Sequence, residues 1–159
     1  MKVKLFITLA GAIFLIHACS ESFNNSSTSL DSHEISSRLD RVNTLRAEIK
    51  APTDFYDAEF QLFNVNGFSN SRISVPGASS WDYKFVVKLN MADISPWLEG
   101  FEEMSRAEYD QSWTNDLTKH MPERWSRSDS PEMYKRPGQD VVIILYRSEG
   151  ILFKRVINL

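Results

Sequence analysis

VVIILY at residues 141–146 is the stretch of sequence that decides the fold. It is a continuous run of β-branched and other apolar side chains, which predicts a central strand buried on both faces. Ser148, Glu149 and Gly150 then predict a turn, and residues 151–157 (ILFKRVI) predict the returning strand. Lys154 and Arg155 mark its more exposed part. The C-terminal segment therefore predicts a β-hairpin inside an antiparallel sheet.

Two more strands are predicted upstream from alternating side chains. Residues 56–62 place Tyr, Ala, Phe and Leu on one side and Asp, Glu and Gln on the other, which is typical of a half-buried strand. Residues 83–89 repeat the pattern, with Val86 as an apolar residue on the outer side. Residues 72–75 predict a short strand before the loop at 76–81. Together with the hairpin, these segments predict a single antiparallel sheet of four to five strands.

The helices complete an α+β fold. Asp31 and Glu34 form a capping box, and apolar residues then recur at helical spacing until Pro52. We therefore expect an N-terminal amphipathic helix over residues 31–50, packed on one face of the sheet. A short helical layer is predicted in the middle, from the Ser-Pro pair at 95–96 and from residues 105–119. Residues 121–139 predict an irregular loop.

The N-terminus has the pattern of a targeting segment. Lys2 and Lys4 precede an uncharged stretch at residues 5–16. As a helix this stretch would rise about 18 Å, which is short of the ~30 Å hydrocarbon core of a bilayer. An export signal therefore fits better than a membrane span.

The residues that follow, Ile16-His17-Ala18-Cys19-Ser20, resemble the lipobox of bacterial lipoproteins. This resemblance implies that Cys19 is diacylglycerol-modified and becomes the first residue of the mature protein. Cys19 is the only cysteine in the chain, so no internal disulfide is available to the exported domain. The alternative is ordinary cleavage after Ser20, which would release a soluble domain without a cysteine.

The expected organisation is therefore a signal peptide at residues 1–18, a lipidated cysteine and flexible tether at 19–30, and one globular α+β domain at 31–159. The tether is rich in Ser and Asn and would span about 18 Å as a random coil. No known family is recognised in the globular part.

Charge and ligand types exclude some functions. The net charge of −3 argues against a nucleic-acid partner, which needs a basic face. His33 and His120 lie far apart in the sequence, and no metal-binding motif is present, so neither a metal nor a cofactor is predicted.

Catalytic patterns are weak. Ser79 and Ser80 lie in a loop with His120 as the available base, but no nucleophile motif surrounds them. A sugar-cleaving carboxylate pair would have to come from five acidic residues among which the sequence does not choose. These are Glu99, Glu102, Glu103, Glu108 and Asp110.

Aromatic residues are the more suggestive feature. Trp97 and Trp113 lie on predicted helical segments and are expected in the core. Trp81 and Trp125 lie in predicted loops, and Arg124 and Arg127 flank Trp125. Because tryptophan and arginine are enriched at binding hot spots, these four residues are the candidate binding surface.

The preferred interpretation is a non-enzymatic, membrane-tethered binding module of the bacterial envelope, of the kind that inhibitor and immunity proteins represent. Its partners would be the bilayer, through acylated Cys19, and an envelope protein or cell-wall component. Ser20 resembles the outer-membrane sorting pattern of hosts with two membranes, so the domain would face the periplasm. The alternatives are a periplasmic hydrolase using His120 with a loop serine or a carboxylate, and a structural assembly subunit.

Overall fold

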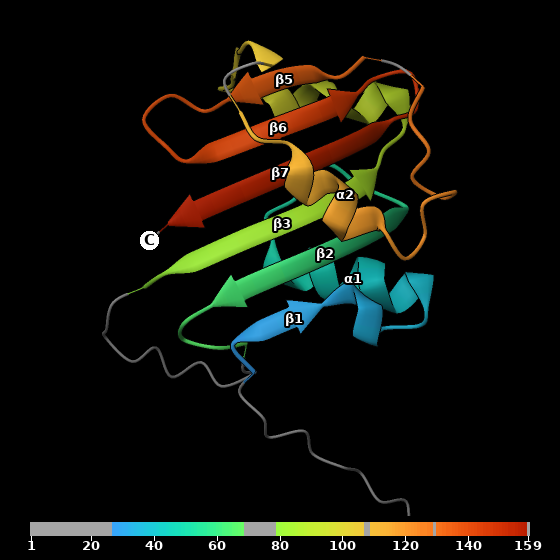
Figure 1. Cartoon of the computed structure of the whole chain (residues 1–159), viewed down its shortest axis with the longest axis vertical. Coiled ribbons are helices and arrows are strands. Elements are labelled where there is room, and N and C mark those ends of the chain that lie inside the picture. Colours follow the sequence, from blue (N-terminus) through green and yellow to red (C-terminus); the bar gives the residue numbers. More distant parts are fainter. Residues whose placement is uncertain (1–26, 69–78, 107–108, 129, 159) are drawn as a thin grey trace, which may run out of the picture.

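A computed structural model describes residues 27–68, 79–106, 109–128 and 130–158 (Figure 1). These residues form one antiparallel sheet of seven strands, in the order β1-β2-β3-β7-β6-β5-β4. The strands are β1 (Ser29–Asp31), β2 (Asp57–Asn64), β3 (Trp81–Lys88), β4 (Glu102–Glu103), β5 (Glu132–Lys135), β6 (Val141–Tyr146) and β7 (Ile151–Asn158). The α+β class is confirmed, whereas four to five strands was too few.

The helices are short. They are α1 (Arg38–Glu48), α2 (Ser112–Thr118) and three 3-10 helices, η1 (Ser32–Glu34), η2 (Met91–Asp93) and η3 (Ser95–Leu98). None in the described part of the chain is long and apolar enough to cross a membrane. α2 covers only the second half of the helix predicted at 105–119. The loop predicted at 121–139 contains the strand β5.

The C-terminal hairpin is confirmed as the centre of the sheet. β6 pairs with β7 over its whole length, and five of its six residues are buried. β7 lies between β6 and β3 (Figure 1). The turn ends at Gly150, where φ is +63° and a Cβ would collide with the carbonyl oxygen of Leu89. This position therefore requires glycine.

Both faces of the sheet are covered. On the α1 face, Val42 and Leu45 pack with Phe60 and Phe85, and Trp97 of η3 joins the same core. On the α2 face, a second core is formed by Val86, Trp113, Leu117, Trp125, Met133, Ile144 and Phe153, among others. Trp97 and Trp113 are 2% and 6% exposed, so their predicted core positions are confirmed.

The chain does not begin its described part with a helix, which corrects the sequence prediction. Ser29–Asp31 pairs with β2 as an edge strand, and Asp31 caps η1 by accepting from the His33 amide at 2.9 Å. The N-cap of α1 is Ser37, whose hydroxyl accepts from the Asp40 amide. The predicted tether thus ends in β1, and its residues 19–26 lie outside the described residues, as does the strand predicted at 72–75.

β2 departs most from its predicted role, because its polar side is buried. Asp57 and Glu59 are 4% and 3% exposed, since α2 and the loop that follows it cover the face on which these side chains lie. Two buried carboxylates need cationic partners.

Arg41 of α1 supplies most of that compensation. Its guanidinium lies 3.2 Å from Glu59 Oε1 and 3.8 Å from Asp57 Oδ1, and the residue is 1% exposed. Its Nε hydrogen is directed at the carbonyl oxygen of Ala58 at 3.2 Å, so the contact with Glu59 is ionic rather than a hydrogen bond. Arg124, from beyond α2, adds a contact of 3.5 Å to the other oxygen of Asp57.

Arg41 also closes the edge of the sheet where β1 is too short to reach. β1 pairs with residues 61–63 of β2 only. Beyond this point the Ala58 carbonyl accepts from Arg41, and the Phe60 amide donates to the buried Ser32 hydroxyl at 3.0 Å. Side chains therefore replace the missing strand at an edge that would otherwise expose unpaired backbone groups.

Replacing Arg41 with methionine should lower the free energy of unfolding by about 3–5 kcal/mol, because two buried carboxylates and the Ala58 carbonyl lose their partner. Urea denaturation measures this loss. Arg38→Met, on the exposed first turn of the same helix, is the control and should stay within about 0.5 kcal/mol. Adding Asp57→Asn and Glu59→Gln to Arg41→Met should recover part of the loss. An Arg41→Met variant as stable as Arg38→Met would contradict this account of the edge.

Candidate functional site

A cavity of about 330 Å³ opens on the α1 face of the sheet, between the end of α1 and the segment around η3. We call it the α1-face cavity. The register of the sheet builds its floor, since Tyr83 lies opposite Val156 and Phe85 lies opposite Lys154. Trp97 of η3 closes one side, held by its indole N–H, which donates to the Thr53 hydroxyl at 2.7 Å. The aromatic side chains of Tyr83, Phe85 and Trp97 are therefore held in place by the sheet and the core, and charged side chains complete the lining.

Three cations line this cavity: Lys50 is exposed at the rim, whereas Lys154 and Arg136 are partly buried. Lys154 Nζ lies 5.4 Å from the centre of the Phe101 ring and 5.9 Å from that of Trp97. The guanidinium carbon of Arg136, in the turn between β5 and β6, lies 4.6 Å from the centre of the Phe101 ring. One Arg136 amino group donates to the carbonyl oxygen of Glu99 at 3.1 Å. Its buried Nε has no hydrogen-bond partner among the described residues.

The charges of Lys154 and Arg136 act on each other. Burial, together with the positive charge of Arg136, lowers the pKa of Lys154 to about 8. Within the described residues, neither cation forms an ion pair with a carboxylate. Glu48 lies at the rim, at the end of α1, and burial raises the pKa of its carboxyl. The cavity therefore combines an apolar floor with an uncompensated positive charge.

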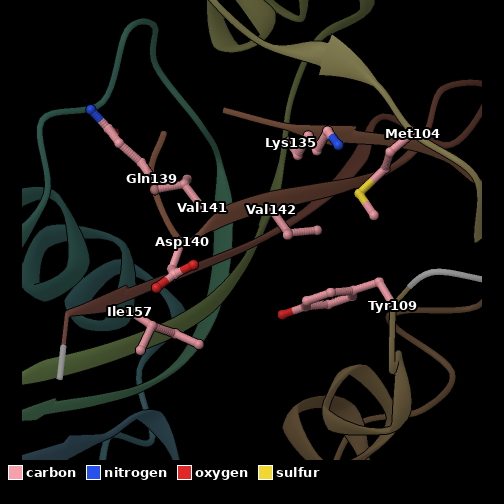
Figure 2. Close-up of a pocket in the computed structure, with 8 residues that line it drawn as sticks. All are labelled: Met104, Tyr109, Lys135, Gln139, Asp140, Val141, Val142 and Ile157. Atoms are coloured by element: carbon pink, nitrogen blue, oxygen red, sulfur yellow. The ribbon is translucent and has the colours of Figure 1, made fainter. Parts of the chain in front are cut away.

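A second cavity, of about 250 Å³, lies on the opposite face. Figure 2 shows Met104, Tyr109 and Val142 turned toward a common space, with Gln139 pointing away from it. Burial raises the pKa of Tyr109. The charged residues that line this cavity, Lys135 and Asp140, are exposed, so their charges are solvated rather than held in an apolar wall. The charge pattern of the α1-face cavity is the more unusual of the two.

The four candidate binding residues do not form one surface. Trp81 is half-buried and lines the α1-face cavity. Trp125 is 1% exposed and belongs to the core of the α2 face, so its predicted surface position is wrong. The loop that carries it folds back onto the sheet, and the ring belongs to the same buried core as Val86 and Phe153.

The two arginines beside Trp125 fasten this loop. Arg124 pairs with Asp57. Arg127 lies over the rings of Tyr146 and Phe153, and it donates to Thr114 Oγ1 at 3.2 Å and to Asn115 Oδ1 at 2.9 Å. These contacts give both residues a structural role, and a role in binding stays a prediction.

The structure separates Ser79 and Ser80 from His120. The Ser80 carbonyl accepts from Val65, just beyond the end of β2, whereas His120 precedes the loop that reaches Asp57 at the start of β2. The eight residues of β2 extend about 26 Å. His120 instead meets His33, with their ring centres 3.5 Å apart.

Metal ligands do not gather in the described part of the chain. His33 Nδ1 lies 3.2 Å from Asp31 Oδ1, but no group of three or more histidine, cysteine or acidic side chains that could hold a metal ion occurs among these residues. Of the acidic residues considered for sugar cleavage, Glu102 and Glu103 form the exposed strand β4, and Glu108 lies outside the described residues.

Sequence reasoning missed Lys154 and Arg136. Residues 151–157 gave Lys154 only the role of an exposed strand position. A usable signal was present, because Lys154 has the same strand phase as Leu152 and Val156 and therefore lies on an apolar face. Arg136 carried no local signal, since a turn brings it over Phe101 from a distant part of the chain.

Lys154 should make the protein more stable as the pH rises from about 8 to 10. Its pKa is about 8 in the folded state against an ordinary value of 10.5, so the unfolded chain binds more protons in this window and the free energy of unfolding increases with pH. Below pH 8 both states are protonated and the contribution is constant. The measurement is the wild-type free energy of unfolding minus that of Lys154→Met, at several pH values.

Taking this difference removes the contribution of the tyrosines to the pH dependence of stability. Burial raises the pKa of Tyr83, Tyr109 and Tyr134, which lowers stability as pH rises above about 10, and all three are present in both proteins. Lys119→Met, at an exposed position, is the control and should give a difference that does not change with pH. The same flat result for Lys154→Met would contradict a buried charge in this cavity.

Comparison with known proteins finds no matching family model, no matching curated protein and no matching solved structure. Function therefore has to be inferred from the chain's own residues.

Proposed function

We propose that the protein is a lipoprotein of the bacterial envelope that acts as a membrane-tethered, non-enzymatic binding module. The observation that carries the proposal is the placement of Cys19. The only cysteine of the chain follows an uncharged stretch of export-signal length, in a sequence that resembles a lipobox. Lipidation requires a cysteine at the end of the export signal, and the only cysteine of the chain lies there.

The fold indicates how such a tether would orient the domain. The described part of the chain enters the sheet through β1, where Ser29 lies opposite Phe63. The neighbouring residue of β2, Asn64, lies opposite Trp81. A short tether from Cys19 would therefore hold the membrane near the end of the sheet that carries Trp81. The α1-face cavity, which Trp81 also lines, would lie toward that end.

A binding role fits the side chains better than hydrolysis with a loop serine. Ser79 and Ser80 lie at the opposite end of β2 from the loop that follows His120, so no serine–histidine pair is assembled from these residues. The α1-face cavity instead combines aromatic side chains with two partly buried cations, Lys154 and Arg136, and offers no nucleophile paired with a base. Such a combination suits recognition.

Location and partners follow from the same features. Ser20 after the cysteine directs the protein to the outer membrane if the host has two membranes, with the domain facing the periplasm. The net charge of −3 disfavours a nucleic-acid partner. The partner would be an envelope protein or a component of the cell wall.

The expected product in bacteria is membrane-bound and carries acyl mass on Cys19. Cys19→Ala should abolish both properties, because the alanine side chain offers no thiol for lipidation. Intact mass spectrometry and membrane fractionation measure the two effects. His17→Ala, at the tolerant position of the lipobox, is the matched control and should remain acylated. A soluble wild-type product that begins at Glu21 would overturn the lipoprotein proposal.

A further inference from the structure

The two partly buried cations of the α1-face cavity, Lys154 and Arg136, lack the carboxylate partners that other arginines of the domain have. Arg155 donates to both carboxylate oxygens of Asp82 at 3.0 and 2.8 Å, and Arg147 donates to those of Glu132 at 2.8 and 2.7 Å. Arg41 is compensated by Asp57 and Glu59. In the described residues, Lys154 and Arg136 have no such carboxylate.

This arrangement is unfavourable unless an anion completes it. Two like charges that share a partly desolvated site repel each other, and desolvation adds to the cost of each. The rings of Phe101 and Trp97 offset part of that cost through cation–π contacts. A ring nevertheless cannot supply the hydrogen-bond acceptor that the buried Nε of Arg136 lacks. A carboxylate would satisfy this donor and neutralise the charge.

The rest of the cavity selects for an apolar body attached to the anion. Tyr83, Phe85 and Val156 form a floor next to the cations, and Trp97 forms a wall. The volume of about 330 Å³ suits a small molecule. At the rim, the exposed side chains of Glu48 and Lys50 carry opposite charges, so the positive charge inside the cavity comes from Lys154 and Arg136.

We propose that the α1-face cavity binds a small organic acid, with its carboxylate between Lys154 and Arg136 and its apolar body against Trp97 and Tyr83. This inference deepens the proposed binding function and rests on it only for its biological setting. It assigns to the cavity a ligand class, the small carboxylates with an aromatic or aliphatic body. It also assigns the specificity to two cations that come from β7 and from the turn before β6.

Calorimetric titration of the full chain in a non-ionic detergent tests the proposal, with 3-phenylpropionate as the probe. The matched ligand controls are 3-phenylpropionamide, which keeps the ring and loses the charge, and acetate, which keeps the charge and loses the ring. We expect measurable binding of 3-phenylpropionate alone. Equal affinity for the amide would overturn the role of the cations. Equal affinity for acetate would overturn the role of the aromatic walls.

Two variants locate the site. Lys154→Met keeps the length of the side chain, and Arg136→Gln keeps a hydrogen-bond donor but removes the charge. Each should weaken 3-phenylpropionate binding by about tenfold to a hundredfold, which corresponds to one lost charged hydrogen bond. Lys135→Met, on β5 in the lining of the opposite cavity, is the control and should bind as the wild type does. Unchanged binding in both variants would overturn the proposal.

The outcome is independent of the membrane anchor. Binding is measured on purified protein whether or not Cys19 carries acyl groups, so a failed lipidation experiment leaves the ligand result intact. Conversely, a membrane-bound protein that ignores 3-phenylpropionate would retain the proposed tether and lose the proposed ligand class. Urea denaturation of each variant shows whether lost binding is due to unfolding, and the second variant keeps the test decisive if one is unstable.

Discussion

The buried guanidinium of Arg41 is the interaction on which the two-layered architecture depends. It donates to backbone carbonyls of Ile35, Ser36 and Ala58, and it compensates two carboxylates that lie on the far side of β2. One side chain of α1 thereby crosses the edge of the sheet and joins both layers. Because Arg124 pairs with Asp57 as well, the loop after α2 is fastened to the same cluster. A planar, permanently charged group with five donors is suited to this position, and a lysine could not serve all of these acceptors.

Coverage of both faces explains where the aromatic residues lie. A sheet with one wet face would leave Trp113 and Trp125 free for a partner, but here α2 and its following loop use them to cover Val86 and Phe153. The aromatic residues of the α1 face have a different arrangement, since α1 covers β2 and η3 covers another part, leaving the floor around Tyr83 and Phe85 open as a cavity. The incomplete helical layer on that face is thus the physical reason why a cavity exists there.

The sequence predicted the elements that carry strong local patterns and missed those that depend on distant contacts. VVIILY indicated a strand buried on both faces because its run has no polar interruption, and the structure confirms it. The same logic failed for β2, where the polar side chains of Asp57 and Glu59 predicted a solvent-exposed face. Alternation of polar and apolar residues cannot show whether a second layer covers the polar face. Strands of two to four residues such as β1, β4 and β5 are too short for any periodic signal. In the candidate site, Trp81 was identified from the sequence, whereas Lys154 and Arg136 become neighbours only through the sheet register and the turn before β6.

The contrast between complete and incomplete ion pairs gives the α1-face cavity its significance. Sequences that fold well are consistent at every level, and violations of local rules concentrate at functional sites. Arg155 pairs with Asp82, Arg147 with Glu132 and Arg41 with two carboxylates. Partly buried arginines elsewhere in the domain are therefore supplied with carboxylate partners. Leaving Lys154 and Arg136 together without one costs stability that a methionine at position 154 would restore. Such a cost is expected where the missing charge arrives with a ligand, since the energy withheld from folding becomes available for binding.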